Sequence, residues 1–162
     1  MIPEYKTILY ATDLAVNARQ VFKTALSIAE RFNARIHIVH VVPEMDASHL
    51  NYLSALIGEE KFKERELKLN EEIIQTLSGR LERLAKEELE TNPEAIKLVA
   101  GIEVLHGHPV DQILKAATRH SADLLVLGSH GKGPIEHTWL GSVVQKTLRK
   151  SRYPVLVVPV PE

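Results

Sequence analysis

Five short runs of apolar residues constrain the fold of this 162-residue chain more than any other feature. Most of them are rich in Val, Ile and Leu without a polar alternation, and they cover residues 8–11, 36–42, 102–105, 124–127 and 155–158. Continuous apolar runs of this length are typical of strands buried on both faces, as in a parallel sheet covered by helices. The runs therefore predict a parallel sheet at the centre of the molecule.

The segments between these runs carry a helical pattern. Residues 17–32 place Phe22, Leu26 and Ala29 on one face at helical spacing. Residues 109–120 repeat this pattern and begin with a proline, which the first position of a helix tolerates. A shorter helix is expected over residues 142–150. This alternation of strands and helices predicts one doubly wound α/β domain that spans residues 1–162.

The crossover between the second and third runs, residues 43–100, is the irregular part of the pattern. Residues 47–57 are mildly apolar, whereas 18 of the 36 residues from 59 to 94 are charged. Mixed-sign charge beside regularly placed leucines is typical of a long amphipathic helix with a solvated outer face. A regulatory or partner-binding helix is the alternative. Gly79 is a candidate position for a kink.

The composition excludes several classes of function. Twenty basic residues face 21 acidic ones, which argues against general binding of nucleic acids or anionic membranes. The chain has no cysteine, so disulfides, thiolate nucleophiles and cysteine-based metal sites are excluded. No apolar run approaches the roughly 18 residues that cross a bilayer, and the N-terminus does not resemble a secretory signal. We therefore expect a cytoplasmic protein without a membrane span.

The segment LGSHGKGPIEHTWLGSVV, residues 127–144, carries the chemistry. It begins at the end of the fourth apolar run and contains four of the eight glycines, Gly128, Gly131, Gly133 and Gly141. Glycine lets the backbone approach a ligand closely. Gly141 and Ser142 stand where the last predicted helix begins, and the N–H groups of a helix start favour an anion. A strand end, a glycine loop and a helix start together predict a phosphate cradle.

The spacing Gly-x₂-Gly-x₉-Gly-Ser, from Gly128 to Ser142, resembles the nucleotide-binding signature of the universal stress protein family. Further segments resemble the same family: ILYATDLAVNA, HIVHVV, GHPVDQIL, ADLLVLGSHGKG and YPVLVVP. The resemblance covers almost the whole chain except residues 44–98, and the glycines point to the ATP-binding branch. It implies five parallel strands in the order 3-2-1-4-5 with helices on both faces.

The resemblance also implies which residues contact the nucleotide. Asp13 and the backbone near Ala11 and Val41 would border the adenosine end, and Leu127 and Gly128 the ribose. The full set comprises Ala11, Thr12, Asp13, Val41, Leu127, Gly128, Ser129, His130, Gly131, Lys132, Gly141, Ser142, Val143 and Val144. Many ATP-binding members have Ser or Thr in place of Val144, so this chain lacks a hydroxyl contact worth about 1.5–3 kcal/mol.

By this resemblance the protein is an ATP-dependent regulator or sensor of stress with an unidentified protein partner. A slow ATPase and a nucleotide-free dimeric scaffold are the alternatives, and no catalytic residue is assigned. Mg²⁺ or Mn²⁺ is expected to enter through the phosphates of ATP, without a metal site made by the protein. A homodimer is expected through the last strand, because the apolar segment 153–161 would lie at a sheet edge.

Overall fold

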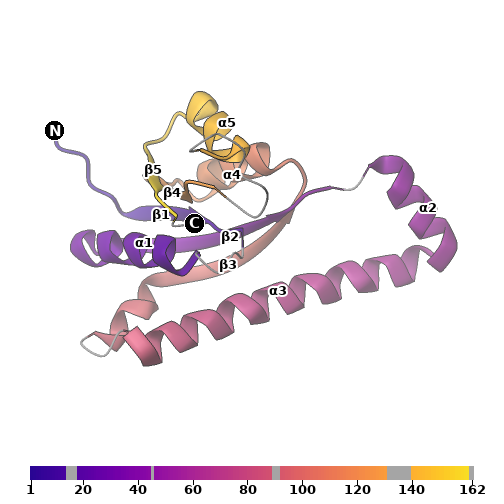
Figure 1. Ribbon diagram of the computed structural model, residues 1–162, viewed down its shortest axis with the longest axis horizontal. Coiled ribbons are helices and arrows are strands. Elements are labelled where there is room, and N and C mark those ends of the chain that lie inside the picture. The colour runs from indigo at the N-terminus through magenta and orange to yellow at the C-terminus, as the bar shows by residue number, and fades with distance from the viewer. Residues whose placement is uncertain (14–17, 45, 89–91, 131–139, 161–162) are drawn as a thin grey trace.

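The computed structural model describes residues 1–162 except 14–17, 45, 89–91, 131–139 and 161–162. Five strands form one sheet in which every neighbouring pair is parallel, in the order β3-β2-β1-β4-β5 (Figure 1). The strands are β1 (Thr7–Ala11), β2 (Arg35–Val42), β3 (Val99–His106), β4 (Leu124–Gly128) and β5 (Val155–Val158). The predicted fold class and strand order are both confirmed.

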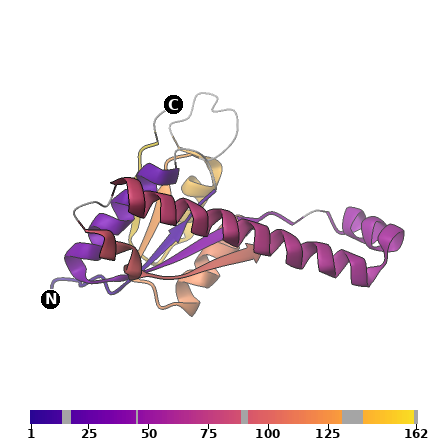
Figure 2. The same ribbon diagram turned by 90° about the horizontal axis from the view of Figure 1, so that it is seen from below.

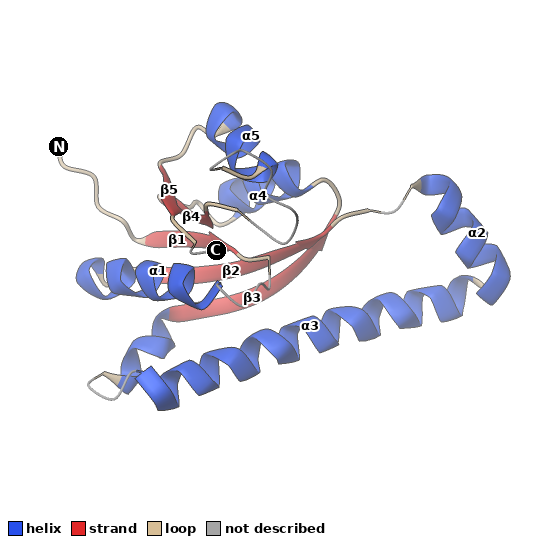
Figure 3. Ribbon diagram, in the orientation of Figure 1, coloured by secondary structure: helices blue, strands red, loops and turns tan. Residues whose placement is uncertain are grey.

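Helices cover both faces of the sheet (Figure 3). On one face, α1 (Ala18–Phe32), α3 (Glu59–Glu88) and the 3₁₀ helix η1 (Pro93–Leu98) pack over one apolar cluster. On the other face, α4 (Pro109–Arg119) and α5 (Ser142–Lys150) pack over a second cluster. The sheet therefore lies buried between two helical layers, which explains why its strands lack a polar alternation.

Strand β1 shows how the two layers share one strand. Ile8 and Tyr10 belong to the cluster beneath α1, whereas Leu9 between them belongs to the cluster beneath α4. All three side chains are at most 3% exposed. Because successive side chains of a strand point to opposite faces, a strand covered on both sides must be apolar at every position.

The second crossover contains α2 (Ala47–Ile57), α3 and η1. Helix α3 continues without interruption across Gly79, the candidate position for a kink. Strand β3 begins at Val99, three residues before the predicted start, because Gly101 pairs with His37 of β2 and extends the ladder. The apolar run does not indicate these three additional residues, because Gly101 interrupts the apolar pattern.

Candidate functional site

The carboxyl ends of β1 and β4 lie side by side at the centre of the sheet, where Ala11 pairs with Leu127. From β1 the chain passes to α1 on one face, and after β4 the next described helix, α5, lies on the other. Parallel sheets bind ligands at such a switch point, outside the carboxyl ends of the strands. The predicted site residues of β1, β4 and α5 lie at this edge.

Directly after β1, two hydrogen bonds of its backbone hold Thr12 in place. Its N–H donates to Val39 O (2.9 Å), and its carbonyl oxygen lies 2.8 Å from Nδ1 of His40. Thr12 is 7% exposed, so it presents little side-chain surface. His40 lies outside the predicted site and supports it from β2. No local pattern in the sequence indicates this contact, because it joins residues 28 positions apart.

Tyr10 lies in the same strand, on the α1 side. Its hydroxyl donates to Ala18 O (3.0 Å), and burial raises the pKa of Tyr10 to about 12, against the opposing effect of a hydrogen bond with Thr12. The nearby charge of Asp13 raises the pKa further. The Tyr10 hydroxyl therefore stays protonated at neutral pH and cannot act as a base. It fixes the start of α1 instead.

The turn after β4 is held by buried contacts with the C-terminal segment. Ser129 is 1% exposed; its backbone N–H donates to Val158 O (2.9 Å), and its hydroxyl accepts the Val160 N–H (3.0 Å). The same hydroxyl lies 3.1 Å from Nδ1 of His130. A Cβ added to Gly128 would lie 3.0 Å from a methyl group of Val160, so this glycine permits a close approach. Ser129 and Gly128 thus shape the turn through packing.

The start of α5 lies directly on this turn. Gly141 is the N-cap residue, and its N–H donates to Ser129 O (2.8 Å). A Cβ on Gly141 would lie 3.3 Å from Cα of His130, so a larger residue would push the two segments apart. Gly141 offers no side-chain cap. The first N–H groups of α5 have no acceptor within the helix, an arrangement that in general favours an anion.

The predicted residues of the described part differ in what they can offer a ligand. The side chains of Leu127 and Val144 are 4% and 5% exposed and lie in the core beneath α4 and α5. Their contribution is limited to backbone atoms. Val41 is half-buried at the end of β2 and packs against the same cluster, whereas Ser142 is exposed. Gly131 and Lys132 lie outside the described residues.

No group of three or more His, Asp or Glu side chains in the described residues could hold a metal ion. No helix in that part of the chain is long and apolar enough to cross a membrane.

The topology defines a doubly wound α/β protein in which a helix starts at the switch point, at the carboxyl edge of its sheet. The chain belongs to the universal stress protein family, whose model matches residues 4–159. A universal stress protein of Methanocaldococcus jannaschii is 29% identical over 158 residues, covering 95% of this chain and 94% of its own. One from Thermus aquaticus is 33% identical over 159 residues, covering 95% and 98%.

Solved structures of the family share the fold. A universal stress protein from Lactobacillus plantarum matches with a TM-score of 0.69 at 21% identity, over 97% of this chain and 99% of its own. Another, solved in complex with cAMP, has a TM-score of 0.59 at 24% identity and covers 97% and 98%. A third, from Archaeoglobus fulgidus in complex with dAMP, has a TM-score of 0.56 at 21% identity and covers 96% and 98%.

Proposed function

We propose that the protein binds ATP at the carboxyl ends of β1 and β4 and acts as a nucleotide-dependent regulator. The observation that carries this proposal is the uncapped start of α5, which lies against the turn after β4. Relatives of the same fold bind adenine nucleotides, cAMP in one case and dAMP in another. An adenine nucleotide carries phosphate groups, so a single ligand of this kind would also supply the anion that the helix start favours.

The phosphates would lie at the start of α5, where the N–H groups of Ser142 and Val143 donate to them. Hydrogen bonds to a charged acceptor contribute about 1.5–3 kcal/mol each, and the positive end of the helix dipole adds to them. Leu127 and Gly128 would border the ribose, and Asp13 the adenosine. Because valine has no polar side-chain atom, the backbone N–H is the only donor that Val144 offers.

A divalent cation, Mg²⁺ or Mn²⁺, would enter with the triphosphate and be held by phosphate oxygens and water. When bound, the cation neutralises phosphate charge. The protein would add the helix start of α5 on the opposite side of the phosphates.

Regulation would follow because bound nucleotide orders the site. This ordering would change a surface that a partner protein recognises. A slow ATPase needs a positioned water and charged groups around the terminal phosphate. Phosphate release, compared between the parent and a Gly141 variant, separates this alternative from pure binding. Nucleotide released on denaturing the purified protein separates both from a nucleotide-free scaffold.

The decisive variant is Gly141→Asp. Its side chain would enter the space beside His130 and bring a negative charge to the phosphates. We expect ATP affinity in titration calorimetry to fall by about 100-fold or more, the equivalent of two lost phosphate hydrogen bonds. Gly79→Asp is the matched control, because an added Cβ at Gly79 meets nothing within 4 Å. Both variants should keep the far-ultraviolet spectrum of the parent.

Gly141→Ala separates the two effects of this change. It adds the Cβ without the charge, so its affinity should lie between those of the parent and Gly141→Asp. If ATP binds to Gly141→Asp as tightly as to the parent, the phosphates do not lie at the start of α5 and the proposed site is wrong.

A further inference from the structure

Helix α2 and the first turns of α3 project beyond the sheet and its helical layers, with α2 set at an angle to α3 at the far end (Figures 1 and 2). We call residues 47–69 the arm. Its inner boundary is Asn70, whose Oδ1 lies 2.7 Å from Nε2 of His106 at the end of β3. No residue of the arm is buried, whereas Leu77 further along α3 is 6% exposed. The arm therefore lies outside the core that stabilises the rest of the chain.

The arm exposes apolar side chains. Of the nine large hydrophobic residues that are exposed in the described part of the chain, four lie here: Tyr52, Leu56, Leu67 and Leu69. Tyr52 and Leu56 are both 63% exposed and stand one helical turn apart on α2. An apolar stripe of this kind, on an 11-residue helix, has more to gain from a packing partner than from water.

The charge pattern favours an identical partner. Helix α2 contains no Asp, Glu, Lys or Arg, and residues 59–69 of α3 contain four acidic and four basic residues. A two-fold axis brings the residues near the axis close to their own copies, so the centre of a self-pairing face must avoid like charges. An uncharged helix on an arm without net charge meets this condition. The arm also lacks the basic excess that draws a protein to an anionic membrane.

We propose that the arm is a self-association surface, on which α2 of one copy packs against α2 of a second copy of this chain. Tyr52 and Leu56 form the centre of the contact. An 11-residue helix is only about 16 Å long, so the interface is small and the association weak. This contact is independent of the nucleotide and uses no residue of the candidate site.

The absence of cysteine in the natural sequence allows a direct test. Ala55→Cys places one thiol on the exposed side of α2, beside Leu56. Under mild oxidation, we expect this variant to form a disulfide-linked dimer at high protein concentration. Ser27→Cys, on the exposed face of α1, is the matched control and should remain largely monomeric on a non-reducing gel.

A second substitution shows whether the apolar contact causes the cross-link. Adding Leu56→Glu to Ala55→Cys brings two like charges together at the proposed axis and should reduce the cross-linked fraction several-fold. Adding Lys146→Glu, on exposed α5, should not change it. Sedimentation of the cysteine-free chain should show weak association beyond the dimer expected through the last strand, and Leu56→Glu should abolish only this further association.

The proposal is overturned if Ala55→Cys cross-links no faster than Ser27→Cys, or if Leu56→Glu leaves both the cross-link and the sedimentation unchanged. Co-flotation of the parent, but not of Leu56→Glu, with phosphatidylcholine vesicles would assign the arm to a membrane surface and would also overturn it. Titration of ATP into Leu56→Glu should give the affinity of the parent. A failure of the nucleotide proposal is therefore distinguishable from a failure of this one.

Discussion

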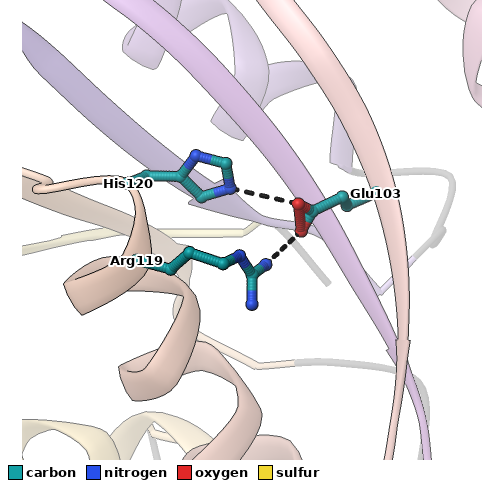
Figure 4. A network of polar contacts seen from close by, with 3 residues as sticks. All are labelled: Glu103, Arg119 and His120. Carbon is teal, nitrogen blue, oxygen red and sulfur yellow. Dashed lines mark hydrogen bonds and ion pairs between the residues drawn. The ribbon is translucent and has the colours of Figure 1, made fainter.

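At the scale of single residues, His37 lies beside a group of polar contacts that is centred on Glu103. Its ring stacks on that of His120 at a centroid distance of 4.0 Å. His120 and Arg119, at the end of α4, both reach the Glu103 carboxylate of β3 (Figure 4). Partial burial lowers the pKa of His37, and the neighbouring His120 and Arg35 lower it further, against the opposing charge of Glu103. Folding therefore favours the neutral form of His37.

This arrangement predicts a pH dependence of stability. Above about pH 6.5, His37 is neutral in both states and its contribution is fully present. As the pH falls below that value the unfolded chain takes up a proton first, so the free energy of unfolding decreases until the folded pKa is passed. Urea unfolding at pH 7.5 and 5 should show a smaller decrease for His37→Gln than for the parent. His49→Gln, on exposed α2, should behave as the parent does; an equal decrease in all three proteins would contradict this assignment.

At the scale of elements, α3 offers a position at which helix propensity alone should change the free energy of unfolding. Gly79 lies inside the helix, and an added Cβ meets nothing within 4 Å. Gly79→Ala should therefore raise the free energy of unfolding by about 0.8–1 kcal/mol, the propensity difference between the two residues. Gly107→Ala is the contrasting variant, because Gly107 has a φ of +135° and its Cβ would lie 3.0 Å from the Gln112 side chain. Urea titration should show it to be less stable than the parent, and a gain in both variants would refute this explanation.

At the scale of the whole molecule, β5 ends the sheet and pairs only with β4 among the described strands. Its free edge offers backbone groups to a second chain, and we propose that two copies pair there about a two-fold axis. Val157→Glu should shift sedimentation from dimer toward monomer. Because Val157 packs partly against the core, Val157→Thr serves as the control for lost packing and should remain dimeric. A parent that sediments as a monomer at micromolar concentration would contradict the pairing, and the Ala55→Cys cross-link should survive Val157→Glu.

Much of the fold could be predicted from local pattern alone. The apolar runs identified all five strands, and the helices of residues 18–32, 109–119 and 142–150 began and ended within a residue or so of the prediction. Periodicity and helix-start signals depend on neighbours along the chain, so a sequence displays them directly. The site was predictable in outline for the same reason: the start of α5 follows from Gly141 and Ser142, whereas the strand order came from the family resemblance.

Only the tertiary structure decided what the site residues contact. The sequence predicts a nucleotide contact for Ser129, and only the structure shows that its buried hydroxyl accepts the N–H of Val160, 31 residues away. His40 supports Thr12 across 28 residues, and the projection of the arm depends on where α3 meets β3. Such contacts join residues that are far apart in the sequence, and no local sequence pattern indicates them. The chain by itself determined which segments are strands and helices and where α5 begins, because these follow from local sterics and periodicity. Which side chains meet was decided by the packing of distant segments against one sheet.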